Sequence, residues 1–392
     1  MTAGRPANLL RPQTGGPARV TNIELFFDLV YVFAVTQLSH YLIDHRSARG
    51  GLQTLLLLAM VWLIWAYTTW VTNWLDPERI PVRLMLLALA LASLVMSAAI
   101  PGAFAGRGLA IGAAYAVMQI GRSVFAVSGL RGDRLQRNFQ RILAWCVVSG
   151  ALALAGGLVA GQARELLWLA AVCVDLLGGV AGFWTPGLGR SSTQDWTIEG
   201  SHFAERCQAF ILIALGESIV VIGAALSALA TVTAQEIVAF LAAFVTSVGL
   251  WWLYFHRSAE AGAQAIASSA DPGRLGRSAY HLIHPVMVAG IIVIAAGDQI
   301  ALSAPGAVGQ APVSVMLLGG TALFLLGHAL FKAVIWHQVS WARIGGAAAA
   351  ALAGLLAPHV SALVLSICAA AIVVAVAAAD HLAERPARAS VR

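Results

Sequence analysis

The chain alternates between long apolar stretches and short polar connections from about residue 22 almost to its end. A helix needs roughly 20 apolar residues to cross the hydrocarbon core of a bilayer. The pattern therefore predicts an all-α, polytopic integral membrane helical bundle with about 12 transmembrane helices. The expected spans are residues 22–43, 52–74, 82–100, 108–128, 139–160, 165–185, 202–226, 237–256, 279–302, 312–335, 341–357 and 360–380.

The last two of these spans are separated by a very short connection at Pro358, and the first of the two contains an alanine run, Ala347–Ala351. Ten or eleven spans are therefore the alternative count. The absence of any long polar loop excludes a separate soluble domain of ordinary size.

Two apolar stretches carry ionisable side chains. Residues 21–40 read TNIELFFDLVYVFAVTQLSH, with Glu24 and Asp28 one helical turn apart, and residues 202–218 read HFAERCQAFILIALGES. Charged groups are costly in hydrocarbon and usually face a bundle interior, a partner or a water-filled pathway. These stretches predict a membrane protein with a polar interior.

Composition agrees with this interpretation, because 59% of the residues are hydrophobic and only 11% are charged, against about 25% charged in a typical soluble domain. Most of the 24 Lys and Arg residues fall on one side of the predicted spans. By the positive-inside rule, both termini are expected in the cytoplasm, and an even number of spans is favoured. The net charge of +6 thus reflects topology, and no nucleic-acid partner is expected.

An internal duplication is suggested when Glu24 is aligned with Glu205. Trp65-Ala66-Tyr67 then resembles Trp252-Leu253-Tyr254, and the segment 121–125 (GRSVF) resembles 327–331 (GHALF). Halves of six helices each would lie parallel, related by an axis along the membrane normal. We expect two six-helix repeats at residues 21–190 and 200–382, with a disordered cytoplasmic tail at 1–20 and a second tail at 383–392.

The segments Glu24–Leu38 and His202–Ser218 resemble the two marks of the bacterial low temperature requirement protein A (LtrA) family, an ELFFDLVFVF-like helix ending in TQL and an HFxERxxxFxxIALGES-like helix. Cys207-Gln208 departs from the family pattern. The resemblance implies a multi-pass protein of the bacterial cytoplasmic (inner) membrane, connected by the family's name with growth in the cold. It does not imply a particular biochemical activity.

Helical spacing groups the polar residues into stripes. Glu24 and Asp28 share one face of their helix, as do His202, Arg206 and Glu217, while Glu205 lies about a quarter-turn away. Glu217 is the deepest acid, so we expect it to carry a proton, meet a cation or hydrogen-bond a neighbouring helix. The candidate substrate or proton pathway comprises Glu24, Asp28, Arg122, His202, Glu205, Arg206, Glu217, His281 and His284.

Arg122 is the candidate partner of one of these acids, because an unpaired guanidinium in mid-membrane is costly. His281 and His284, three residues apart, could suggest a metal site with His202 or Glu205, but hydrogen bonding at a helix end is favoured and no metal or cofactor is predicted. The alternative for all of these helix-end groups is snorkelling toward the interface. No Walker A, G-x-S-x-G or H-E-x-x-H motif is present.

Three functional hypotheses follow. The first is a secondary transporter or permease for a small molecule or ion, with Glu24, Asp28, Glu205 and Glu217 as protonatable coupling sites. The second is a membrane-embedded enzyme acting on a lipid or lipophilic substrate through His202, Glu205, His281 and His284. The third is a non-catalytic membrane protein supporting growth in the cold. In each case the lipid bilayer is the expected partner, and the oligomeric state is left open.

Overall fold

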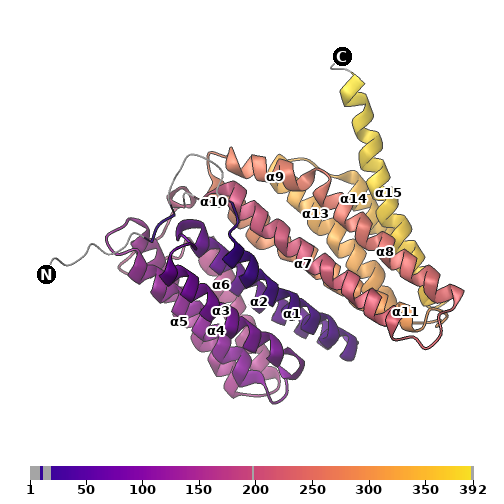
Figure 1. The fold of residues 1–392 in the computed structure, drawn as a ribbon, viewed down its shortest axis with the longest axis horizontal. Helices are drawn as coiled ribbons and strands as arrows, with labels where there is room; N and C mark the ends of the chain where they lie inside the picture. The colour runs from indigo at the N-terminus through magenta and orange to yellow at the C-terminus, as the bar shows by residue number, and fades with distance from the viewer. Residues whose placement is uncertain (1–8, 12–18, 197, 390–392) are drawn as a thin grey trace. The chain divides into compact units, whose positions relative to one another are not determined.

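A computed structural model describes residues 9–11, 19–196 and 198–389, with side chains to residue 382. Over these residues the chain is helical, with three isolated β-bridges and no named strand, so the all-α prediction is confirmed (Figure 1). The elements are α1 (Asn22–Asp44), α2 (Ala48–Trp74), α3 (Ile80–Ala99), η1 (Ile100–Gly102), α4 (Gly108–Gly129), α5 (Leu135–Leu158), α6 (Gln162–Val180), η2 (Thr193–Asp195), α7 (Gly200–Ser227), α8 (Ala234–Phe255), α9 (Ser258–Ala267), α10 (Pro272–Leu275), η3 (Gly276–Ile283), α11 (His284–Ser303), α12 (Ala311–Ser314), η4 (Val315–Gly319), α13 (Gly320–Trp336), α14 (Trp341–Gly354) and α15 (Ala362–Ala389).

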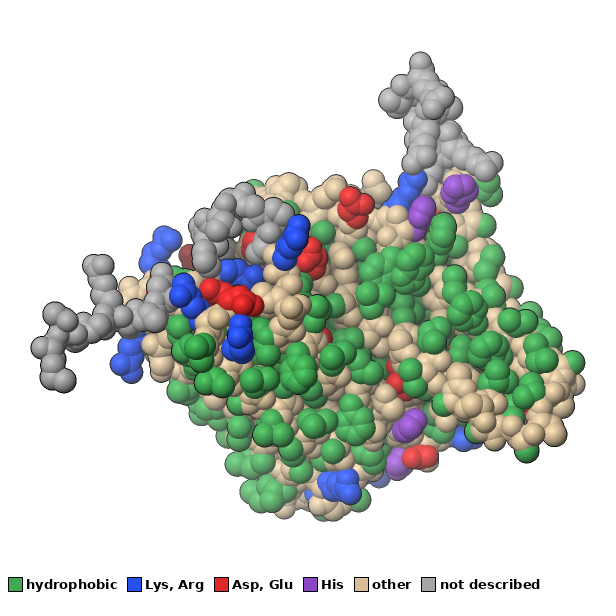
Figure 2. Space-filling view, viewed as in Figure 1, with side chains coloured by type: hydrophobic (Ala, Val, Ile, Leu, Met, Phe, Trp, Pro, Cys, Tyr) green, Lys and Arg blue, Asp and Glu red, His purple; other side chains and the backbone are tan. Residues whose placement is uncertain are grey.

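Ten helical stretches of the described chain are long and apolar enough to cross a membrane. The predicted count of twelve is not confirmed, because two of the expected spans, α6 and α14, are not among these stretches. The 19 residues of α6 include Arg164, Glu165 and Asp175, and α14 has only 14 residues. Hydrophobic side chains are spread over the displayed surface in Figure 2, as expected for helices that face lipid.

The chain divides into two compact units, the first comprising Met1–Leu38, Leu52–Arg206 and Ala267–Arg277. In the first unit α3 packs against α4, α4 against α5, and α5 against α6. Gly112 of α4 allows the close approach of α5, because a Cβ there would lie 2.2 Å from the Ala153 carbonyl oxygen. Small residues at such crossings are typical of membrane helix packing.

Helix α2 supplies much of the interior of the first unit. Trp62 and Trp65 are fully buried, and the Tyr67 hydroxyl donates a hydrogen bond of 2.9 Å to the Asp175 carbonyl of α6. On its other side the Trp65 indole donates to Asp28 of α1. Helix α2 is thereby tied to α1 and α6, and it positions the polar groups described below.

The second unit comprises Ser39–Gly51, Cys207–Ile266 and Ser278–Arg392. Here α8 packs against α15, α11 against α13, and α14 against both α13 and α15. Gly290 of α11 allows α13 to approach, since a Cβ there would lie 2.7 Å from the Phe324 amide nitrogen. The core of this unit is apolar and centred on Leu317, Leu365 and Ala369.

Parts of both expected tails have defined structure. Residues 1–8 and 12–18 of the first tail lie outside the described residues, but Leu10 forms a bridge with Leu75 and the Arg11 amide donates to the Trp74 carbonyl at 2.8 Å. At the other end α15 continues to Ala389. The arrangement in two parallel repeats stays a prediction.

Candidate functional site

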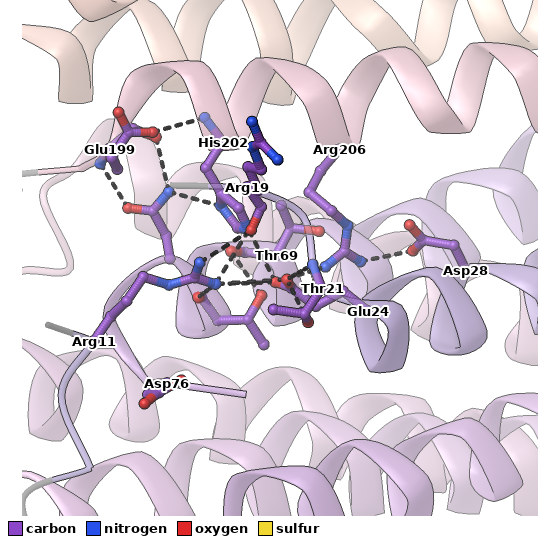
Figure 3. Close-up of polar contacts among 12 residues, drawn as sticks. Arg11, Arg19, Thr21, Glu24, Asp28, Thr69, Asp76, Glu199, His202 and Arg206 are labelled. Atoms are coloured by element: carbon purple, nitrogen blue, oxygen red, sulfur yellow. Dashed lines mark hydrogen bonds and ion pairs between the residues drawn. The ribbon is translucent and has the colours of Figure 1, made fainter. Parts of the chain in front are cut away.

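Four of the sequence-predicted residues meet in the first unit, where they form a buried ion-pair network (Figure 3). Glu24 and Asp28 come from the first turns of α1, and His202 and Arg206 from the first turns of α7. At most 3% of the surface of any of them is exposed. Spacing of four residues places each pair on one helix face, so two acids meet an imidazole and a guanidinium.

Arg206 bridges the two carboxylates. Its Nη1 donates to Glu24 Oε1 at 3.1 Å and its Nη2 to Asp28 Oδ1 at 2.6 Å. The guanidinium also lies 5.7 Å from the centroid of the Trp65 ring, a cation–π arrangement. Arginine suits this position because its planar fork presents several donors in fixed directions.

Glu24 accepts hydrogen bonds on both oxygens. Oε1 accepts from His202 Nε2 at 3.0 Å as well as from Arg206, and Oε2 accepts from the Thr21 amide and hydroxyl, both at 2.9 Å. The bond back to the amide that precedes the helix is one half of a capping box. A carboxylate with this many donors is held in its ionised form, so Glu24 is the fixed anion of the network.

Asp28 differs from Glu24 in that only one of its oxygens is engaged. Oδ1 accepts from Trp65 Nε1 at 2.7 Å and from Arg206. Oδ2 is buried and has no hydrogen-bond partner among the described residues. A buried polar atom without a partner is costly, and a proton on Oδ2 would lower that cost without displacing any donor.

The tautomer of His202 follows from its neighbours. Asn73 is oriented by two bonds with Glu199, since its Oδ1 accepts from the amide at 2.8 Å and its Nδ2 donates to the carbonyl at 2.9 Å. Asn73 Nδ2 therefore faces His202 Nδ1, 3.2 Å away, as a donor. If Nδ1 accepts this bond, the proton of a neutral ring is on Nε2, which lies 3.0 Å from Glu24 Oε1 and 3.2 Å from Arg11 Nη2.

Arg11 completes the network from outside the helices. Its Nη2 donates to the Thr72 carbonyl at 2.9 Å and lies 3.5 Å from each oxygen of Glu24. With His202 neutral, the two carboxylates face two guanidiniums, a balanced set of charges, as a buried ionic group requires.

Arg122, the remaining first-unit candidate, belongs to a second polar group. It is buried on α4, donates to Gln119 Oε1 and lies 5.2 Å from the centroid of the Tyr67 ring. Gln119 in turn donates to Asp175 Oδ2 at 2.5 Å. Arg122 therefore reaches an acid through an amide, and that acid is on α6 rather than α1 or α7.

The other candidates lie outside this network. Glu205 is exposed on α7. Glu217, His281 and His284 belong to the second unit, and all three are buried. His284 Nε2 accepts from the Tyr254 hydroxyl at 2.7 Å. Over the described residues, no three His, Cys, Asp or Glu side chains gather as metal ligands would.

Sequence reasoning missed Arg11, Asn73 and Asp175. Arg11 falls within the expected N-terminal tail, and no sequence signal distinguishes an arginine that folds back onto a helix. Asn73 and Asp175 are polar residues within predicted spans, and that property could have added them to the candidates.

The apolar helices and the buried ionic network define a multi-pass helical membrane protein with a polar interior. Residues 19–378 match the family model described as bacterial low temperature requirement A protein (LtrA). The chain belongs to this family. It is 35% identical over 355 residues to the uncharacterized protein RA0937 of Rhizobium meliloti (strain 1021), covering 90% of this chain and 86% of that protein. No solved structure matches the chain.

Proposed function

We propose that this protein is a proton-coupled secondary transporter in which Asp28 carries the coupling proton. The observation that supports the proposal is the asymmetry of the two acids, because both oxygens of Glu24 accept hydrogen bonds while Asp28 Oδ2 accepts none from the described residues. Intramembrane carboxylates of this kind are typical of proton relays in pumps and transporters.

Protonation of Asp28 changes the charge of the network by one unit. The ionised form balances two acids against Arg11 and Arg206, whereas the neutral form leaves an excess positive charge on the guanidiniums. Arg206 then keeps Glu24 as its anionic partner, and its Nη2 is released from the charge of Asp28. An excess cation in a buried site attracts an anion, so we propose that the proton and an anionic solute move together.

Proteoliposomes provide the test. They enclose a pH-sensitive dye at equal pH on both sides, and monocarboxylates, dicarboxylates, acidic amino acids and inorganic phosphate are added outside one at a time. We expect at least one of these anions to acidify the lumen of vesicles containing the protein more than that of protein-free vesicles, because the proton enters together with the anion. The response should be lost in Asp28→Asn and kept in the matched control Glu205→Gln, which changes an exposed acid of α7.

The proposal is wrong if none of these anions acidifies the lumen beyond the protein-free control. It is also wrong if Asp28→Asn responds like the unaltered protein while present in the membrane at the same level.

Orientation in the cytoplasmic membrane, with both termini in the cytoplasm, is part of the same proposal. Accessibility labelling of single cysteines near the two ends tests it.

A further inference from the structure

Asp175 of α6 is a buried carboxylate of the first unit that lies outside the ion-pair network. Its Oδ2 accepts from the Tyr115 hydroxyl and, at 2.5 Å, from Gln119 Nε2, and both donors belong to α4. Oδ1 is buried and has no hydrogen-bond partner among the described residues. A buried polar atom without a partner is costly, so a proton can bind at Oδ1 without displacing a donor.

Gln119 links this acid to a cation. Its Oε1 accepts from Arg122, and a guanidinium can only donate. The oxygen end of the Gln119 amide is thereby fixed toward Arg122, and the nitrogen end must donate to Asp175. When Asp175 is ionised, its charge is therefore compensated by Arg122 across a single amide.

Arg122 also has partners that carry no charge. Its Nη1 lies 3.3 Å from the Ile64 carbonyl oxygen and 3.4 Å from Thr68 Oγ1, and its guanidinium lies over the Tyr67 ring. These three partners belong to α2, and none of them depends on the charge of Asp175. The guanidinium therefore keeps hydrogen-bond acceptors and a cation–π partner when the acid becomes neutral.

The helix α5 provides an acceptor for the protonated acid. The Ser149 hydroxyl donates to the Cys146 carbonyl at 3.3 Å, and Ser149 is close enough to act on the Asp175 carboxyl. With its hydrogen directed to Cys146, the Ser149 oxygen is left to accept a hydrogen bond. A carboxylic acid can donate that bond, whereas a carboxylate cannot.

The other titratable groups around Asp175 keep their charge state between neutral and acidic pH. Tyr67 of α2 donates to the Asp175 carbonyl, Tyr115 of α4 donates to the carboxyl, and the buried Cys146 thiol of α5 interacts electrostatically with both Asp175 and Arg122. Phenol and thiol groups are neutral at and below neutral pH, and a guanidinium stays charged. Among these groups, Asp175 alone can change its charge over this range.

We propose that Asp175 is a second proton-binding site, which takes up a proton on Oδ1 separately from Asp28. The two acids are arranged alike, since one oxygen of each accepts from an aromatic side chain and from one further donor. Both are tied to α2, Asp28 through Trp65 and Asp175 through Tyr67. The proton comes from solvent and converts the carboxylate to a neutral carboxylic acid. The inference concerns proton binding alone, so it does not depend on a transported solute.

Infrared difference spectroscopy of the purified protein between neutral and acidic pH tests this inference. We expect a carboxylic acid C=O band that is absent from Asp175→Asn but kept in Asp28→Asn and in the control Glu205→Gln. The C=O oxygen of the protonated acid is Oδ2, so Tyr115→Phe removes one of its two hydrogen bonds and should move this band to higher frequency. Tyr254→Phe, a matched change in the second unit, should leave the band where it is.

Three results would overturn the proposal. The first is a folded Asp175→Asn protein that keeps every band of the unaltered protein. The second is a single band that Asp175→Asn and Asp28→Asn both abolish, because the two acids would then not bind protons separately. The third is a folded Tyr115→Phe protein in which no band moves. If Asp175→Asn does not fold, the comparison of Tyr115→Phe with Tyr254→Phe decides.

Discussion

The two acids of the network should respond very differently to replacement by their amides. In Glu24→Gln the NH2 of the new side chain replaces one of the two carboxylate oxygens, and it meets hydrogen-bond donors at either position. His202 and Arg206 donate to the Oε1 position, and Thr21 donates to the Oε2 position. At least one buried donor is left unsatisfied, at about 1–3 kcal/mol, and Arg206 loses a counter-charge. Breaking a buried ion pair from one side costs about 3–5 kcal/mol, and we expect a loss in this range.

Asp28→Asn keeps the two hydrogen bonds that matter most for packing. The amide oxygen can take the place of Oδ1, accepting from Trp65 and Arg206, while the amide nitrogen takes the place of Oδ2, which has no hydrogen-bond partner among the described residues. The variant loses attraction to Arg206 but also loses a buried charge, and these effects oppose one another. We expect Asp28→Asn to be less destabilising than Glu24→Gln by about 2 kcal/mol or more.

Equilibrium unfolding in mixed micelles of a mild detergent and sodium dodecyl sulfate, followed by circular dichroism, measures this difference. Glu205→Gln is the matched control, since it alters an exposed acid of α7, and it should change the free energy of unfolding by less than about 0.5 kcal/mol. The reasoning is refuted if Asp28→Asn is as destabilising as Glu24→Gln, or if Glu24→Gln behaves like the control.

Three further predictions concern stability in the same unfolding assay. Arg206→Met should cost about 3–5 kcal/mol by leaving two buried acids without their shared cation, and a loss below about 1 kcal/mol would contradict the ionic network. Gly112→Ala should cost about 1–3 kcal/mol, because its Cβ would lie 2.2 Å from the α5 backbone. Gly121→Ala has open space at the Cβ position and should be neutral. Equal effects of the two substitutions would contradict the close approach of α4 and α5. Tyr254→Phe should cost about 1–3 kcal/mol by leaving a buried histidine nitrogen of α11 without its donor, and a neutral result would show that this bond does not contribute.

Sequence alone was sufficient for the class of protein and for the helical nature of the chain, because both depend on the length and apolarity of contiguous segments. Helical periodicity also separates Glu205 from His202 and Arg206, and in the structure Glu205 is exposed while the other two are buried. The count of spans was harder to predict, since α6 is short and carries three charged side chains while α14 has only 14 residues.

Partner choice could not be predicted from sequence in the same way. Arg122 donates to Gln119, which in turn donates to Asp175, and not to the acids of α1. This arrangement depends on how α4 and α6 pack and not on any local spacing. Arg11 belongs to a segment that lacks helical periodicity, so no sequence pattern predicts its position in the network. The number of carboxylate oxygens that meet a donor, which distinguishes Asp28 from Glu24, is likewise a property of the packed structure.

Infrared difference spectroscopy between neutral and acidic pH tests most directly whether Asp28 is the proton-carrying acid. The account predicts a carboxylic acid C=O band that appears on acidification, persists in Glu205→Gln and is absent from Asp28→Asn, while Glu24 stays ionised. A band that survives in Asp28→Asn and is instead lost in a folded Glu24→Gln protein would contradict it, and so would the absence of any such band in the unaltered protein.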